Sequence, residues 1–382
     1  MKKIAIIGAS YLQLPLIKKA KEMGLETHVF AWASEDVGEK EADYFYPISI
    51  VEKEKILVEC EKIGISGICT IASDLAIITV NYVANKLGLI GNSLECTLKS
   101  TNKYFMRKCF NENGDPYTHN VLVDSAVDID IDRLKFPVIV KPIDRSGSRG
   151  ITKVENRYEL ESAIQIAKSY GFDKKVIVED YIDGEEYSVE CLSYDGKHRF
   201  LQLTYKYTTG SPNYIEICHL EPAPVSEETL EKIKVVVFHA LDSLGIKYGA
   251  SHTEIKIDND GEIKLIEIGG RMGGDLIGSS LVKNSTGYDF VRGVIEVSLG
   301  YEPKIDIVKN NYSAVRYIFS KDDLSILQDL QKNNEKVLLD YKITGNFLEK
   351  IIDSSNRYGY FMISSSKKED VYQFLPYLPK YR

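Results

Sequence analysis

The sequence predicts an α/β domain at the amino terminus, followed by a larger α+β region. Over the first ninety or so residues, strand and helix patterns alternate, with strands expected at 3–7, 27–31 and 68–71 and helices at 14–23 and 53–63. This alternation implies an open parallel sheet with helices on both faces. A chain of 382 residues exceeds what one small hydrophobic core usually serves, so two or three domains are expected.

From about Lys99 the order of the patterns changes to that of an α+β protein. A short helix is followed by elements expected at 138–140 (strand), 158–169 (helix), 175–179 and 186–193 (strands), and 227–244 (a long helix leading into a hairpin). After Gly300 a third region begins, with a strand expected at 312–319. This order of strands and helices predicts further domains after the first one.

Composition and charge exclude several classes of protein. The chain is 44% hydrophobic and 27% charged, as is usual for globular proteins, and its formal net charge of −8 offers no basic excess to bind nucleic acid. The six cysteines show no paired spacing, so free thiols in a reducing cytoplasm are expected. The most apolar stretch, 63–83, is interrupted by Asp74, and no cleavable leader follows Met1, so we expect neither membrane insertion nor secretion.

Two glutamates on the expected hairpin, Glu254 and Glu267, form the first candidate site. The turn signal at 258–261 places Glu254 opposite Leu265 and Glu267 at the diagonal position on the same face. Diagonal neighbours lie roughly 7–8 Å apart, so the long side chains can converge. Converging carboxylates repel unless a cation lies between them, and oxygen ligands suit Mg²⁺. The alternative is a solvated face of the sheet.

A strand that ends in Lys141 runs into a Gly/Ser loop at 144–150, which is a candidate for phosphate binding. Its backbone N–H groups and hydroxyls can donate to phosphate oxygens, with Lys141 as a compact positive charge. The alternative is a plain solvent loop. The chain has no Walker loop, and the turn at 8–13 carries Ser10 and Gln13 where a dinucleotide fingerprint needs glycine.

The segment 178–189 reads as a strand, a short connector and a second strand. Such a connector offers backbone groups to an adenine edge, and an acid at its far end can accept from ribose hydroxyls. The alternative is a structural acidic turn.

Together and in order, these segments resemble the ATP-grasp superfamily, in particular its L-amino-acid ligases and more distantly biotin carboxylase and the large chain of carbamoyl-phosphate synthase. The resemblance implies an ATP-grasp fold of mixed α/β and α+β class. It assigns 1–98 to an open parallel pre-ATP-grasp domain, 99–300 to the ATP-grasp domain with a lid subdomain at about 112–184, and 301–382 to a carboxy-terminal subdomain packed on it.

The resemblance also implies roles for individual residues. It implies ATP as the cofactor with one or two Mg²⁺ ions, for which Mn²⁺ can substitute, and small-molecule carboxylate and amine substrates joined through an acylphosphate. Relatives are often dimers, so a homodimer is left open. The residues fall into metal ligands (Glu254, Glu267), catalytic residues (Arg271, Asp275), phosphate contacts (Lys103, Lys141, Ser146, Gly147, Ser148), an adenine hinge (Glu179, Asp180, Tyr181, Ile182) and a ribose contact (Glu186).

One departure from the family pattern concerns the metal site. Many members continue the second metal glutamate as Glu-x-Asn, whereas this chain has Gly269 and lacks that amide oxygen. A second Mg²⁺ would then have fewer protein ligands. Two alternative functions therefore stay open beside the ligase, a carboxylase that uses bicarbonate through carboxyphosphate and a non-catalytic ATP-binding module.

Three residues have two interpretations each, and a fourth, Arg316, has one. Asp275 can act on the attacking ammonium or serve as a helix N-cap, and Asp74 can contact the substrate or cap the next helix. His219 can reach phosphate or substrate, or be an ordinary structural histidine. Arg316, on an expected strand, can meet a substrate carboxylate.

Overall fold

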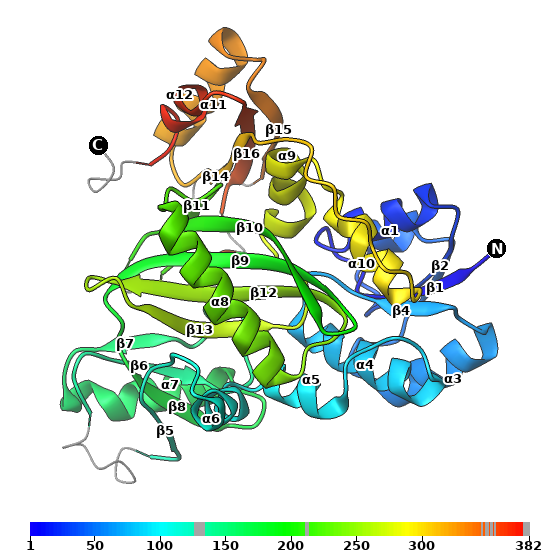
Figure 1. Ribbon diagram of the computed structural model, residues 1–382, viewed down its shortest axis with the longest axis horizontal. Helices are drawn as coiled ribbons and strands as arrows, with labels where there is room; N and C mark the ends of the chain where they lie inside the picture. Colours follow the sequence, from blue (N-terminus) through cyan, green and yellow to red (C-terminus); the bar gives the residue numbers. More distant parts are fainter. Residues whose placement is uncertain are drawn as a thin grey trace.

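The structure is a computed structural model that describes residues 1–125, 134–210, 214–344, 347, 351, 354 and 357–376. These residues form three sheets, shown in Figure 1 as a central antiparallel sheet flanked by an amino-terminal domain and by a smaller sheet. Parts of the expected lid (126–133) and of the expected carboxy-terminal subdomain, including 377–382, lie outside the described residues. The domain boundaries given above stay predictions.

The amino-terminal sheet is parallel, as the alternating pattern predicted. Its strand order is β3-β2-β1-β4, formed by β1 (Lys3–Ile7), β2 (Glu26–Phe30), β3 (Tyr44–Tyr46) and β4 (Gly67–Cys69). The helices of this domain are α1 (Leu14–Glu22), α2 (Val37–Glu41), α3 (Lys53–Ile63) and α4 (Asp74–Leu87). Helix α10 (Phe290–Ser298), from much later in the chain, packs on α1 and β4. Just after β4, the Ala72 N–H donates to the Met272 carbonyl, so the carboxyl end of this strand faces the later part of the chain.

The central sheet has eight antiparallel strands. Their order is β13 (Ile263–Gly269), β12 (Gly249–Asp258), β9 (Gly184–Tyr194), β10 (Lys197–Thr208), β11 (Glu216–Glu221), β14 (Tyr312–Tyr317), β16 (Gly359–Ser365) and β15 (Leu338–Ile343). Strand β14 pairs directly with β11, so the region after Gly300 continues the same sheet. Helix α9 (Val282–Thr286) precedes Gly300, and helices α11 (Lys321–Asn333) and α12 (Lys368–Tyr372) follow it.

Helix α8 (Glu227–Leu244) lies across one face of the central sheet (Figure 1). Its two ends agree with the prediction because both are marked locally. The Ser226 side chain accepts the Thr229 N–H at the start, and Gly245, at φ +78°, ends the helix in the left-handed conformation. Val237, Leu241 and Leu244 of its buried face join the main hydrophobic core.

The third sheet forms one wall of the cleft described below. Its strand order is β5 (Asn120–Val123), β8 (Val176–Asp180), β6 (Val138–Pro142) and β7 (Thr152–Val154), with α7 (Leu160–Tyr170) packed on β6. Helices α5 (Leu94–Thr101) and α6 (Lys103–Asn113) connect the amino-terminal domain to it. The Asn102 side chain caps α6 by accepting the Tyr104 and Phe105 N–H groups, which fixes Lys103 at the start of the helix.

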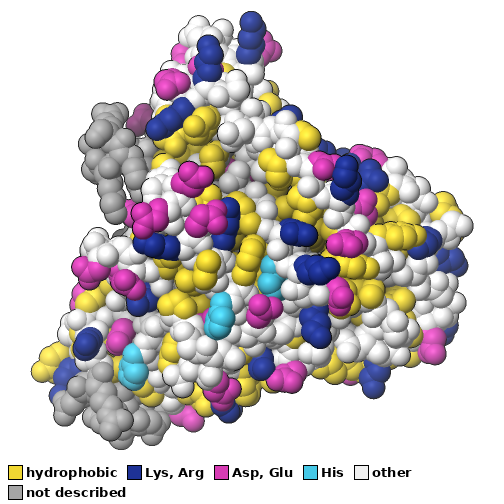
Figure 2. Space-filling model, in the orientation of Figure 1, with side chains coloured by type: hydrophobic (Ala, Val, Ile, Leu, Met, Phe, Trp, Pro, Cys, Tyr) yellow, Lys and Arg dark blue, Asp and Glu magenta, His cyan; other side chains and the backbone are white. Residues whose placement is uncertain are grey.

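Two sequence-based expectations on the described surface can be compared with the structure. On the face shown in Figure 2, basic and acidic side chains are interspersed rather than gathered into a basic track. Among the helices that the structure describes, none is long and apolar enough to cross a membrane.

Candidate active site

Glu254 and Glu267 lie directly opposite each other on β12 and β13. The expected register, with Glu254 opposite Leu265, was wrong. Ile255 pairs with Leu265, and an irregularity between Glu254 and Ile255 then moves Glu254 to Glu267. A bulge of this kind adds one residue on one strand and re-aims the side chains beside it. Because directly opposed side chains share a face of the sheet, the two carboxylates are closer neighbours than the diagonal arrangement would make them.

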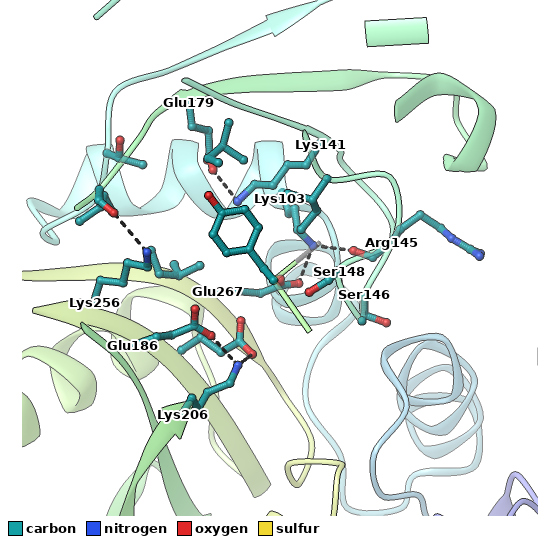
Figure 3. A pocket seen from close by; sticks show the side chains of 18 of the residues that line it. Lys103, Lys141, Arg145, Ser146, Ser148, Glu179, Glu186, Lys206, Lys256 and Glu267 are labelled. Carbon is teal, nitrogen blue, oxygen red and sulfur yellow. Dashed lines mark hydrogen bonds and ion pairs between the residues drawn. The ribbon is translucent and has the colours of Figure 1, made fainter. Parts of the chain in front are cut away.

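Each of the two glutamates is neutralised by a buried lysine. Figure 3 shows Lys103 beside Glu267, and Lys206 beside Glu186. Lys103 Nζ lies 2.6 Å from Glu267 Oε1 and also donates to the Arg145 carbonyl at 2.7 Å. Lys206 Nζ lies 2.8 Å from Glu254 Oε1 and 2.6 Å from Glu186 Oε1, with Glu216 at 4.0 Å. Burial lowers the pKa of Lys206, but the three carboxylates outweigh it and raise the pKa well above its usual value. Lys206 is therefore a cation fixed among acids.

Lys141 pairs with Glu179, and Glu179 also pairs with Arg107 at 2.6 Å. Burial by itself raises the pKa of Glu179. The charges of Arg107 and Lys141 together have the larger effect and lower the pKa to about 2. The pKa of Lys141 is lowered, first by burial and then by Arg107 and Lys103, against the opposing effect of Glu179. Glu179 is thus a buried anchor for two cations, and its side chain already has partners.

The connector after β8 lies at the cleft as well. Its Tyr181 N–H donates to the Pro137 carbonyl at 3.2 Å, and Lys256 Nζ donates to the Ile182 carbonyl at 3.1 Å. Lys256 also lies 5.1 Å from the centre of the Tyr181 ring. These contacts fix the backbone of the hinge between the small sheet and the central sheet. Asp180, the last residue of β8, accepts the Thr118 hydroxyl through its carbonyl at 3.0 Å.

The Gly/Ser loop joins β6 to β7 beside the two glutamates. Gly147, Ser148 and Gly150 adopt φ of +69°, +55° and +71°, which accounts for the glycines and marks Ser148 as the strained member. Asp144 holds the start of the loop by accepting the Phe172 and Asp173 N–H groups at 3.2 and 2.7 Å. The loop thus has a fixed base and a tip that lines the cleft.

Arg271 forms a bidentate ion pair with Asp74 of α4. Its Nε and Nη2 lie 2.9 Å from Asp74 Oδ1 and Oδ2 respectively. Asp74 is not the cap of α4, because Ser73 accepts the Ala76 N–H, so the capping interpretation of Asp74 is wrong. Burial raises the pKa of Asp74, but Arg271 lowers it below its usual value. The pair spans the amino-terminal and central parts of the fold.

Asp275 is held by Arg357, a residue that the sequence analysis did not identify. Arg357 Nη2 and Nη1 donate to the two Asp275 oxygens at 2.7 and 3.0 Å, and the guanidinium carbon lies 3.6 Å from the centre of the Tyr317 ring. Leu276 stands at the N-cap position of the next helical turn, so the expected cap role of Asp275 is wrong. Burial raises the pKa of Asp275, but His219 and Arg357 lower it far below its usual value. A carboxylate this acidic is a poor proton acceptor at neutral pH.

His252 supports Glu254 from below. Its Nδ1 contacts the buried Glu190, its Nε2 lies 3.5 Å from Glu254 Oε1, and Glu190 accepts the Gly273 N–H at 3.0 Å. A Cβ at Gly273 would lie 2.5 Å from a Glu190 oxygen, so only glycine fits. This chain of contacts fixes one of the two opposed carboxylates.

Two other candidates have different outcomes. Arg316 pairs with Asp323 at 2.7 Å and donates to the Phe374 carbonyl at 2.7 Å, so the expectation that it meets a substrate is not supported by its contacts. His219 is fully buried, and its Nε2 lies 3.7 Å from Asp275 Oδ2. Its ring nitrogens have no hydrogen-bond partner among the described residues.

Sequence reasoning missed Lys206, Arg107 and Arg357. Lys206 lies on a strand whose neighbours come from distant parts of the chain, and no local motif marks it. Arg107 lies one helical turn after Lys103 on α6, and this i, i+4 spacing is the one sequence signal that could have identified it. Arg357 reaches the site from just before β16.

Most of the predicted site residues line one cleft that is open to solvent. The cleft includes Lys103, Lys141, the loop 146–148, the hinge 179–182 and Glu186, together with Glu254, Glu267 and Arg271. Asp275 lies in an adjoining pocket that shares Glu254 and Arg271 with the cleft. The structure therefore brings the site residues predicted from the sequence together around two adjoining pockets.

The residues present fit a Mg²⁺ ion that keeps part of its water shell. Among the described residues, no group of three or more His, Cys, Asp or Glu side chains has the arrangement of a metal site. The protein therefore offers two carboxylates, and Gly269 adds no side-chain oxygen. Mg²⁺ commonly accepts one or two carboxylates and completes its shell with water and substrate phosphates, so the donor set is compatible with it.

Comparison with known proteins finds a family match in the middle of the chain and sequence similarity to ligases. Residues 134–279 match the family described as "ATP-grasp domain". The alanine–anticapsin ligase of Bacillus subtilis is 26% identical over 267 residues, covering 64% of this chain and 54% of that protein. The D-alanine–D-alanine ligase of Mannheimia succiniciproducens is 30% identical over 178 residues, covering 44% and 55%. The chain thus matches about half the length of these curated relatives.

The crystal structure of an L-amino acid ligase from Bacillus licheniformis superimposes with a TM-score of 0.82 at 24% identity, covering 98% of this chain and 96% of that one. The chain therefore contains an ATP-grasp domain and has the ATP-grasp fold. The resemblance deduced from the sequence motifs, and the mixed fold class that it implied, are both confirmed.

Proposed function

We propose that this chain is an ADP-forming ligase that activates a substrate carboxylate as an acylphosphate with Mg-ATP and joins it to an amine. The observation that carries the proposal is the opposed pair Glu254 and Glu267, each beside a lysine, with Arg271 on the same cleft wall. Phosphoryl transfer depends mainly on positioning and on neutralising charge, and these residues supply both. The ligase names of the sequence relatives support the same reaction class.

The first step would take place in the cleft of Glu254 and Glu267. A divalent cation held by the two glutamates would neutralise phosphate charge; Mg²⁺ is the proposed ion and Mn²⁺ a substitute. An oxygen of the substrate carboxylate would attack the γ-phosphorus, and ADP would leave. Lys103 and Lys141 would compensate the phosphate charge, and the loop 144–150 would exclude water that would hydrolyse the acylphosphate.

The second step would place an amine against the acyl carbon. Arg271 would hold the carboxylate and then stabilise the oxyanion of the tetrahedral intermediate, from which inorganic phosphate departs with one former carboxylate oxygen. The low pKa of Asp275 favours a role in which its carboxylate orients the ammonium group, whose proton would pass to water before the amine attacks, and the second proton would leave with the departing phosphate. Glu186 and the hinge 179–182 would hold the ribose and the adenine. A homodimer stays an expectation.

ADP release with Mg-ATP, measured against a matrix of amino acids and small carboxylates paired with amines, tests this function. Each pair is run with and without bicarbonate. Release that requires one acid and one amine supports the ligase. Release that requires bicarbonate favours a carboxylase, and binding of ATP with no release under any condition favours a nucleotide-binding module.

A further inference from the structure

The ion pair between Asp74 and Arg271 joins two parts of the chain that lie 197 residues apart. Both side chains are largely buried, with 15% and 13% of their surfaces exposed. A guanidinium has five N–H donors. Asp74 takes the Nε–H and one Nη2–H, and Nη1 donates to the Met272 carbonyl at 3.3 Å. Two N–H groups therefore remain on a guanidinium that lines the cleft, enough for one carboxylate.

The carboxylate of Asp74 is itself held firmly in position. Asp74 is the first residue of α4, whose positive end favours an acid, and Ser73 caps the helix. The preceding Ala72 adopts φ +59°, an uncommon conformation for a residue with a Cβ. The Ala72 N–H donates to the Met272 carbonyl at 3.2 Å, the same oxygen that Arg271 contacts. The strained residue is thus anchored to the segment that carries the arginine.

Gly269 supplies the space in which this pair lies. A Cβ built on Gly269 would lie 2.9 Å from Asp74 Oδ1 and 3.0 Å from Arg271 Cζ. Any larger residue at 269, including the asparagine of the Glu-x-Asn pattern, would push the pair aside. The glycine at 269, which departs from the Glu-x-Asn pattern, therefore leaves the room that the Asp74–Arg271 ion pair occupies.

We propose that Asp74 is a positioning residue for Arg271, presenting the free edge of the guanidinium to the substrate carboxylate, and that Gly269 is required to make room for it. This inference rests on the proposed ligase function. In this proposal, Asp74 makes no direct contact with the substrate and acts only through Arg271.

Steady-state kinetics of Asp74→Asn, Asp74→Glu and Gly269→Ala test the inference, with the acid and amine found for the wild-type protein. Asp74→Asn is expected to lower kcat/KM for the carboxylate roughly 10- to 100-fold, as loss of an orienting partner commonly does, with the KM for ATP unchanged. Gly269→Ala should reproduce this loss without unfolding the protein, because the atoms it displaces are side-chain ends. Asp74→Glu keeps the charge and should restore part of the activity.

Asp289→Asn is the matched control. Asp289 caps α10 and pairs with Lys19 of α1 at 3.0 Å, so it also joins the amino-terminal domain to the rest of the fold, but away from the cleft. This variant should lose stability and keep its kinetic constants. If it lost activity as Asp74→Asn does, the effect would belong to the domain interface, and the inference would be overturned.

A double variant separates action through Arg271 from direct contact. Asp74→Asn combined with Arg271→Lys should be no worse than Arg271→Lys alone, because the second change has already removed what the first one disturbs. If the loss of activity in the double variant equalled the product of the two single losses, Asp74 would act independently of Arg271. A lower KM for the carboxylate with unchanged kcat in Asp74→Asn would show that Asp74 merely competes for the guanidinium, and would equally overturn the inference.

The orientation of Arg271 can also be observed without turnover. Its Nε–H resonance in a ¹⁵N spectrum, assigned with Arg271→Lys, should be protected from solvent exchange in the wild type and in Asp289→Asn but not in Asp74→Asn. If the wild type joins no acid and amine while this pattern holds, the ligase function fails and the positioning by Asp74 stands. If protection survives in Asp74→Asn, the positioning fails whatever the activity.

Discussion

Lys206 is the counter-ion of three glutamates at the candidate active site. Its ammonium lies within 4.0 Å of Glu186, Glu216 and Glu254 and is almost completely buried. These three carboxylates are partly buried, so without such a partner they would be left as uncompensated charges with limited access to water. A divalent cation beside Glu254 would therefore share this carboxylate with Lys206, and the two cations would compete for the same negative charge.

Lys206→Met is expected to lower the free energy of unfolding by roughly 3–5 kcal/mol, because three carboxylates lose their cation. Added Mg²⁺ or Mn²⁺ should then stabilise the variant more than the wild type. Urea unfolding with and without metal measures both effects. Lys256→Met is the matched control, because Lys256 lies in the same cleft but donates to a carbonyl, and a metal should not favour that variant. Equal metal effects in all three proteins would contradict this view of Lys206.

At the scale of elements, the sequence predicted those parts whose signals are local. The ends of α8 were predicted because Ser226 and Gly245 mark them, and the Glu254 hairpin was predicted from its turn residues. The register of that hairpin could not be predicted, because the bulge beside Glu254 has no signature in the residues around it. Long-range pairs such as Arg271 with Asp74 depend on how domains pack, which no single segment encodes.

The loop 144–150 is expected to close over bound nucleotide and to become less accessible. Arg145 and Arg149 provide tryptic sites within it. Mg-ATP or Mg-ADP should slow cleavage at these two positions several-fold, while cleavage after the exposed Lys62, far from the cleft on α3, should keep its rate. Fragment masses over a time course measure this. Equal slowing at both places would indicate general stabilisation instead of loop closure.

At the scale of the whole molecule, the central sheet joins the regions before and after Gly300, and it carries a buried acid. Glu221, at the end of β11, is fully buried and accepts the hydroxyls of Thr204 and Ser285, each at 2.8 Å. Burial raises its pKa from 4.5 to about 8, although both hydrogen bonds lower it. The folded protein therefore holds this proton more tightly than the unfolded chain does.

The contribution of Glu221 to stability should be fully present below pH 4.5 and lost as the pH rises through about 8. Between these limits, the free energy of unfolding should fall by up to about 1.4 kcal/mol per pH unit. Glu221→Gln cannot titrate, so its stability relative to the wild type should rise from pH 5 to 8 and level off above. Urea unfolding of both proteins across this range measures the difference. A difference that is independent of pH would show that Glu221 is ionised in the folded protein.

Transfer of ¹⁸O from a labelled substrate carboxylate tests the central claim, carboxylate activation at the cleft of Glu254 and Glu267, most directly. With the acid and amine that support ADP release, the acylphosphate route predicts one ¹⁸O in each inorganic phosphate released, detected by mass spectrometry. Arg271→Ala should still bind Mg-ATP but give almost no labelled phosphate. Phosphate that carries no label while ADP and the joined product form would contradict the account, because the carboxylate would then not have been phosphorylated.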